Sequence, residues 1–241
     1  MDDKGLAEVL RFHREELLSV LTEIASALEA IEKKGHPRAH VKKLLDHYRG
    51  TSKIIVLTGW RLGHAVRQVH DFYGWKAKGD VRRRGLCSGA LYRTAAYLRI
   101  PKNARCGSRL GKTVHIEHTV PVAVLTKSLR HESRDFVSPE RLHHHLMRLS
   151  VCTAMSFNEE QLLRKTPHRP PHPAFDDEGL QIGDLPFSRY ANLTRIHPDF
   201  RVYNVLTGDR LNLSKFTFAD HTGALRFAAA QVGQPKLYDL N

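Results

Sequence analysis

Residues 113–122 restrict the fold of this chain more than any other segment, because their polarity alternates with a period of two. Apolar valine and isoleucine alternate with polar histidine and glutamate in T-V-H-I-E-H-T-V-P-V. This period is typical of a strand with one buried face, and Pro121 closes it. Neighbouring side chains of a strand point to opposite faces. Glu117 and His118 can therefore face one group only if the strand bends at its end.

Helical and extended patterns both occur along the chain, which predicts an α+β fold. Apolar residues recur at helical spacing over 5–34. A glycine and a proline then end this helix, and a second one is expected at about 38–48. We divide the chain into a helical N-terminal region, residues 1–50, and a basic mixed domain, residues 51–241.

The mixed domain is expected to contain both strands and helices. Its expected elements are an alanine-rich helix at 86–98, the strand at 113–122, a helix at 139–149 with Ser138 as its cap, a second strand at 148–157, a helix at 158–165, short strands and turns at 186–192 and 200–213, and a helix at 223–232. The central part of the chain thus has the order strand, insertion with a helix, strand, helix.

The net charge of the chain indicates a polyanionic partner. The 241 residues include 38 Lys and Arg against 25 Asp and Glu, a formal net charge of +13. Nucleic acid is the commonest polyanion, although a merely basic soluble protein has the same balance. Basic residues mixed with tyrosines suit phosphate contacts and base stacking, or else form a solvated basic face. The candidate nucleic-acid contacts are Lys76, Lys78, Arg82, Arg83, Arg84, Arg93, Lys112 and Arg189.

Cysteine usage and hydropathy point to a cytoplasmic protein without a membrane span. The three cysteines form no C-x-x-C pair, which argues against a zinc ribbon. Their odd number and the polar start M-D-D-K-G favour a reducing compartment. No apolar run approaches the roughly 18 residues that a membrane helix needs.

The two expected strands and the helix after them, over about 112–165, resemble the HNH-type (ββα-metal) nuclease finger. In that family an acidic residue or a histidine at the end of the first strand binds a metal, the next histidine activates water, and a proline often follows. A further metal ligand comes from the helix after the second strand. The resemblance implies His118 as general base and Glu117 as first metal ligand. It implies a second ligand among Asn158, Glu159 and Glu160, and leaves His115 as an extra ligand or a phosphate contact.

The implied ligands are mainly oxygen donors, which suit Mg²⁺ or Mn²⁺ better than zinc. The chain departs from the family pattern where an asparagine usually orients the catalytic histidine. His143, His144 or His145 could serve there, or could form a solvated patch. The distance along the chain from His118 to Asn158 is also longer than in compact family members.

The expected function is that of a metal-dependent endonuclease that hydrolyses phosphodiester bonds of duplex DNA, such as a restriction or defence nuclease. The N-terminal helices would pack on the rest of the chain, form a homodimer or position the DNA. Two alternatives stay open: a non-enzymatic nucleic-acid-binding protein, and a metal-dependent hydrolase of another substrate. The enzyme requires Glu117, His118 and one side chain of residues 158–160 to converge within a few ångströms.

Overall fold

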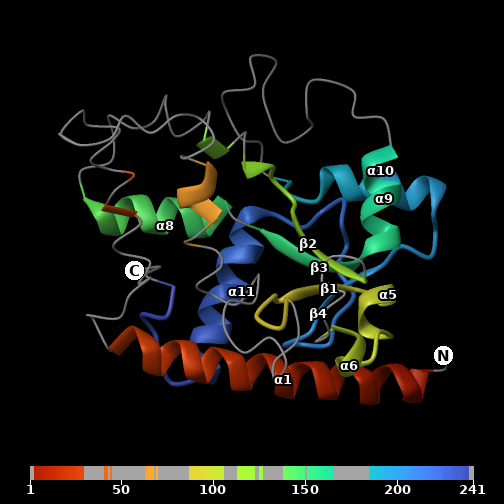
Figure 1. Ribbon diagram of the computed structural model, residues 1–241, viewed down its shortest axis with the longest axis horizontal. Coiled ribbons are helices and arrows are strands. Elements are labelled where there is room, and N and C mark those ends of the chain that lie inside the picture. The colour runs from red at the N-terminus through yellow and green to blue at the C-terminus, as the bar shows by residue number, and fades with distance from the viewer. Residues whose placement is uncertain are drawn as a thin grey trace.

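The computed structural model describes residues 3–29, 41–42, 44, 63–67, 69, 87–105, 113–122, 125–126, 138–149, 151–165 and 185–238. Helices and strands alternate irregularly along these residues, which confirms the α+β class (Figure 1). The elements are α1 (Asp3–Glu29), β1 (Tyr92–Thr94), α5 (Ala95–Leu98), α6 (Lys102–Arg105), β2 (Val114–His118), α8 (Pro139–Leu149), β3 (Cys152–Ser156), α9 (Phe157–Lys165), α10 (Ser188–Ile196), β4 (Val202–Asn204) and α11 (Phe218–Gln231).

The four strands form one mixed sheet in the order β2-β3-β1-β4. β2 and β3 are antiparallel, β1 and β3 are parallel, and β4 is antiparallel to β1. In the β2–β3 pair, Val114 lies opposite Ser156 and His118 lies opposite Cys152. The start of α9 therefore lies beside the start of β2, whereas Glu117 and His118 lie at the other end of that strand.

Several elements have local signals strong enough to predict them, and these predictions are confirmed. The alternating segment at 113–122 forms β2, and α8 begins directly after Ser138, whose hydroxyl accepts a hydrogen bond from the backbone N–H of Arg141 at 3.3 Å. β3, α9 and α11 also occur where strands and helices were expected. The long N-terminal helix is confirmed as α1, and residues 30–34 of its expected range lie outside the described part of the chain.

Two expected elements are wrong. Residues 86–98 do not form one helix, because Tyr92–Thr94 is a strand that pairs with β3 on one side and β4 on the other, followed by the short helix α5. Residues 186–192, expected as short strands and turns, instead lead into the helix α10. In both places tertiary contacts override the local pattern.

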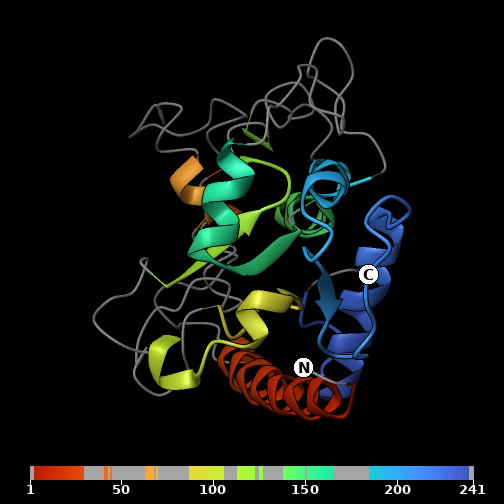
Figure 2. The same ribbon diagram turned by 90° about the vertical axis from the view of Figure 1, so that its right-hand side faces the viewer.

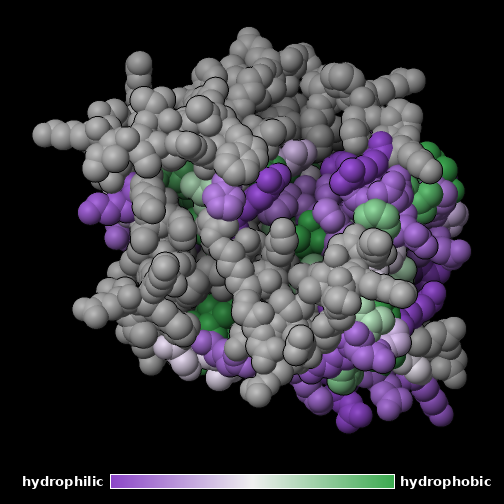
Figure 3. Space-filling view, in the orientation of Figure 1, coloured by the Kyte–Doolittle hydropathy of each residue, from purple (hydrophilic) through white to green (hydrophobic). Residues whose placement is uncertain are grey.

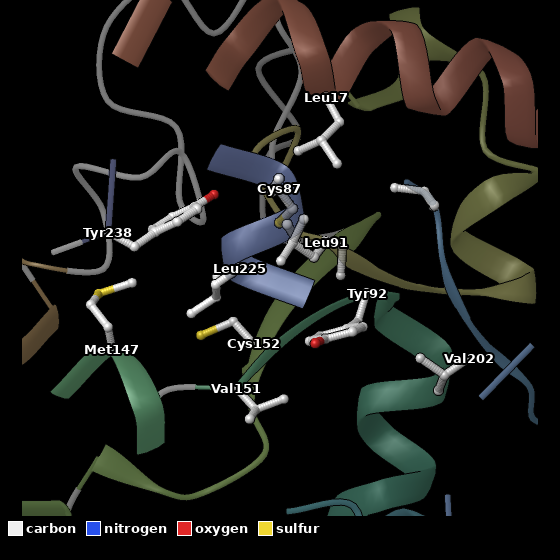
Figure 4. Close-up of a cluster of buried hydrophobic side chains, with 14 of the residues drawn as sticks. Leu17, Cys87, Leu91, Tyr92, Met147, Val151, Cys152, Val202, Leu225 and Tyr238 are labelled. Atoms are coloured by element: carbon white, nitrogen blue, oxygen red, sulfur yellow. The ribbon is translucent and has the colours of Figure 1, made fainter. Parts of the chain in front are cut away.

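A single hydrophobic core joins the N-terminal helix to the sheet and the C-terminal helix. Figure 4 shows part of it, with side chains from α1, β1, α8, β3 and α11 pointing toward one another. The labelled residues of this cluster are Leu17, Cys87, Leu91, Tyr92, Met147, Val151, Cys152, Val202, Leu225 and Tyr238. Helix α1 contacts α11 and α5 of the same chain, so it packs on the rest of the molecule. No helix among the described residues is long and apolar enough to cross a membrane.

A buried charge cluster attaches α1 to the sheet. The Glu16 carboxylate of α1 accepts hydrogen bonds from Arg93 Nη1 of β1 at 2.8 Å and from Arg105 Nη1 of α6 at 3.0 Å. Both arginine side chains are 0% exposed and that of Glu16 is 6% exposed. Arg93 also donates to the carbonyl oxygens of Ser88 and Ala90. The prediction that Arg93 contacts nucleic acid is therefore wrong, because this guanidinium is buried and engaged by the protein.

Histidine 13 belongs to the same cluster. It contacts Arg93 through Nδ1, and its Nε2 lies 3.1 Å from the carbonyl oxygen of Leu98. A guanidinium can only donate, so Nδ1 accepts from Arg93, and the protonated Nε2 donates a hydrogen bond to the carbonyl oxygen of Leu98. Burial is the main reason that the pKa of His13 lies below its ordinary value, and the nearby arginines lower it further. His13 is thus a neutral core residue.

Candidate functional site

The Glu117 carboxylate at the end of β2 is the centre of the candidate site. Its Oε1 accepts a hydrogen bond from Arg189 Nη1 of α10 at 2.6 Å, and its Oε2 lies 3.5 Å from His115 Nε2. The side chains of Glu117 and Arg189 are 16% and 11% exposed, and that of His115 is 33% exposed. The group is therefore largely desolvated but open to solvent on the His115 side.

Alternation along β2 explains which side chains meet there. Positions 115, 117 and 119 share one face of the strand, and α10 supplies Arg189 to the same face. The antiparallel register places Thr153 of β3 directly opposite Glu117. The period-two alternation at 113–122 implies a common face for His115 and Glu117, and the structure confirms this. Thr153 does not follow from that alternation, because a cross-strand neighbour is known only when the register is known.

The charge state of Glu117 follows from opposing effects. Burial would raise the pKa of this carboxyl, but the contact with His115 and the positive charge of Arg189 outweigh it. The pKa of Glu117 is therefore lowered, and the side chain is an ionised carboxylate at neutral pH. It is a carboxylate held between two nitrogen donors.

Buried hydroxyl groups lie next to this ion pair. Burial raises the pKa of Tyr190 well above its ordinary value, and the negative charge of Glu117 adds to the rise. The hydroxyl groups of Tyr190, Thr153 and Thr119 are all buried without a hydrogen-bond partner among the described residues. Arg189 Nε is likewise buried without a hydrogen-bond partner among the described residues. Each unsatisfied buried group costs about 1–3 kcal/mol, and such groups are commoner at functional sites than in ordinary cores.

His118 does not share the face of Glu117. The regular pairing of β2 with β3 continues through His118, and the backbone N–H of Thr119 still donates to the carbonyl of Val151 at 2.9 Å. The bend that would turn both side chains toward one phosphate is absent from this strand end. His118 nevertheless lies near enough to lower the pKa of Glu117 by its charge.

The residues expected as second metal ligand make other contacts. Glu159 Oε2 accepts from the backbone N–H and hydroxyl of Ser156, both at 3.0 Å, and from the hydroxyl of Thr94 at 2.5 Å. This arrangement caps α9, about 10 Å along β2 from Glu117 at the usual rise per residue. Glu160 forms an ion pair with Arg164 of the next helical turn. Asn158, the remaining candidate, is exposed.

The described residues do not fit an Mg²⁺ or Mn²⁺ site in this arrangement. No three His, Cys, Asp or Glu side chains in the described ranges are grouped so that they could hold a metal ion. Hard cations take several oxygen ligands, whereas Glu117 is the only carboxylate at this strand end among the described residues, and it is paired with Arg189. The expected convergence of Glu117, His118 and residues 158–160 is not seen.

The other predicted contacts lie partly outside the described residues. Arg189 is in place beside Glu117, and Arg93 is in the core. The remaining predicted basic contacts, Lys76, Lys78, Arg82, Arg83, Arg84 and Lys112, lie outside the described part of the chain.

Comparisons with known proteins give no relative for this chain: no family model matches it, and no curated protein or solved structure shows significant similarity to it.

Proposed function

We propose that the protein hydrolyses phosphodiester bonds of nucleic acid, with duplex DNA as its substrate, in a substrate-bound state in which the end of strand β2 bends so that Glu117 and His118 face one phosphate. The proposal rests mainly on the ionised Glu117 that is held between Arg189 and His115, one residue before His118. The antiparallel pair β2–β3 followed directly by α9 supports it, because this is the element order of the nuclease finger that the sequence resembles. The formal net charge of +13 supports a polyanionic substrate.

The histidine next to the ion pair is the feature that favours hydrolysis over simple binding. A surface that only binds phosphate can use a guanidinium held in position by a carboxylate, but it needs no proton acceptor beside it. Hydrolysis of a phosphodiester instead needs an acceptor for the proton of the attacking water and a cation beside the phosphate. In the bent state of the strand end, His118 is the proton acceptor and the guanidinium of Arg189 faces the same phosphate, whereas in the regular strand His118 lies on the opposite face. Glu117 holds Arg189 in position.

Non-enzymatic binding of nucleic acid is the second candidate. The regular strand keeps Glu117 and His118 on opposite faces, and the carboxylates of Glu159 and Glu160 have other partners. If these arrangements persist with nucleic acid bound, the same basic protein would hold DNA without cleaving it.

A cleavage assay and a binding assay on the same samples separate the two candidates. Supercoiled plasmid is incubated with the protein in Mg²⁺, in Mn²⁺ and in chelator, while affinity for a labelled duplex is measured by fluorescence anisotropy. We expect nicked or linear plasmid with the wild type, and a large loss of cleavage in Glu117→Gln with the duplex still bound. Glu140→Gln, at an exposed position of α8, is the matched control. Binding without cleavage under every condition would support the second candidate, and absence of both would contradict both.

A further inference from the structure

A groove lined by three arginines lies against α10, the helix that also carries Arg189. It has a volume of about 590 Å³ and is formed by the second half of α10, the start of β4 and residues 210–214. Figure 2 shows α10 and β4 joined by the short connection that borders it. Arg195, Arg201 and Arg210 line the groove and are exposed. None of its lining residues is acidic, as far as the structure describes the chain.

The arginines of the groove are not used to stabilise the fold. In the described ranges, none of their guanidinium groups forms an ion pair or a side-chain hydrogen bond with the protein, in contrast to Arg93 and Arg105. Three positive charges thus line one groove without an ion-pair partner among the described residues, and a bound anion would supply the missing counter-charge. Guanidinium groups present donors in a rigid fork that matches the oxygens of a phosphate.

The polar side chains of the groove add further donors. Asn192 and Thr194 of α10 and Asn212 of the opposite wall also line it. The carboxamide oxygen of Asn212 accepts from the backbone N–H and the hydroxyl of Ser214, so its amide nitrogen is left to donate to a ligand. Figure 3 shows hydrophilic residues gathered on the side of the molecule where α9 and α10 lie. A set of donors without acidic groups is suited to the oxygens of a sugar-phosphate chain.

Helix α10 connects the groove with the candidate site. Arg189 near its start is paired with Glu117, and Arg195 lies in its last turn. Six residues of a helix rise about 9 Å and turn through about 600°, so these two side chains leave α10 about 120° apart. Arg189 faces Glu117 on the sheet, whereas Arg195 is exposed. A nucleic-acid backbone that contacts both must therefore cross α10.

From the exposed arginines and the other donors of the groove we infer that Arg195, Arg201 and Arg210 bind the phosphodiester backbone of the nucleic acid that is presented at β2. This inference rests on the proposed function for the identity of the partner. The groove supplies affinity and register, because phosphate contacts position a nucleic acid without reading its sequence.

The test compares the wild type with the triple variant Arg195→Ala, Arg201→Ala, Arg210→Ala. The control is the triple variant Arg11→Ala, Arg67→Ala, Arg141→Ala, which removes equal charge at exposed positions outside the groove. Affinity for a labelled duplex is measured over a series of salt concentrations. Each lost phosphate contact lowers the slope of log affinity against log salt by about 1. We expect the groove variant to lose about 2–3 units of slope, for every duplex sequence tried, and the control variant to lose less than one.

Equal slopes for the groove variant and the wild type would overturn the inference, even if the protein binds and cleaves DNA. A wild type that binds no nucleic acid would instead contradict the proposed function itself.

Inorganic pyrophosphate and a mononucleotide, titrated into both variants, detect a site for a small phosphorylated ligand. If the groove variant lost only that binding and kept its affinity for DNA, the groove would not be a backbone site. Circular dichroism checks that both variants are folded, and a triple Arg→Lys variant that retains most of the slope would confirm that charge at this place is what matters.

Discussion

Removing the charge of Glu16 should destabilise the protein strongly. In Glu16→Gln the buried guanidinium groups of Arg93 and Arg105 lose their shared counter-charge, while the size of the side chain at 16 is kept. Breaking a buried ion pair by removing one partner costs about 3–5 kcal/mol in the free energy of unfolding. For a chain of this size each kcal/mol corresponds to roughly 2–4 °C, so the melting temperature should fall by about 6–20 °C.

The pH dependence provides a second check on Glu16. Burial would raise the pKa of this carboxyl, but the positive charges of Arg93 and Arg105 outweigh it and hold the pKa far below its ordinary value. Between the folded and unfolded pKa values the unfolded chain binds more protons, so stability rises with pH. The stabilisation by Glu16 is fully present above about pH 4.5, the pKa in the unfolded chain. It is lost as the pH falls toward the lowered pKa of Glu16 in the folded protein. The difference in the free energy of unfolding between the wild type and Glu16→Gln should therefore be constant near neutrality and should shrink below about pH 4.5.

Urea unfolding followed by circular dichroism measures both effects. Glu15→Gln, an exposed neighbour on α1, is the control and should stay within about 0.5 kcal/mol of the wild type. Two results would contradict a stabilising role for the Glu16 charge. One is a Glu16→Gln variant that is no less stable than this control, and the other is a loss in the free energy of unfolding that is the same at pH 3.5 as at pH 7.

Three further predictions concern α11 and the ion pair at β2. Burial lowers the pKa of His221 to about 4, so the free energy of unfolding should fall by up to about 1.4 kcal/mol per pH unit between pH 6.5 and 4. In urea titrations His221→Gln should lack this pH dependence, and an unchanged dependence would contradict the role of His221. Thr217 caps α11 in a reciprocal pair with Asp220, and Thr217→Ala should cost about 1 kcal/mol in the same assay, whereas no loss would show the cap to be dispensable. Arg189→Ala should raise the pKa of Glu117, observed by NMR titration of the side-chain carboxyl, and an unchanged value would show that Arg189 does not hold its charge.

The sequence predicted those elements whose signals are local. Alternation identifies β2, and the serine and proline at 138 and 139 identify the start of α8. β1 was missed because a central strand is buried on both faces and shows no alternation, so its alanines and tyrosines suggested a helix. It is a strand only because β3 and β4 pair with it.

The candidate site was predicted in part for the same reason. Glu117 and His115 are two positions apart on one strand, so their common face follows from the sequence. Arg189 is 72 residues away from Glu117 along the chain, and its pairing depends on where α10 packs. Arg93 appeared to be a surface cation because Glu16, its partner, is 77 residues away. The regular pairing beyond His118, which removes the expected bend, likewise depends on β3.

Cleavage by His118→Ala tests the central claim most directly. Cleavage of a duplex is measured under single-turnover conditions for the wild type, for His118→Ala and for the control His64→Ala, with affinity measured in parallel. Loss of a general base lowers the rate by about 100- to 10,000-fold. If His118 accepts the proton of the attacking water, His118→Ala should lose activity by this factor while its fold and affinity are retained, and the control should change little. A His118→Ala variant that is folded and cleaves at nearly the wild-type rate would contradict this role of His118.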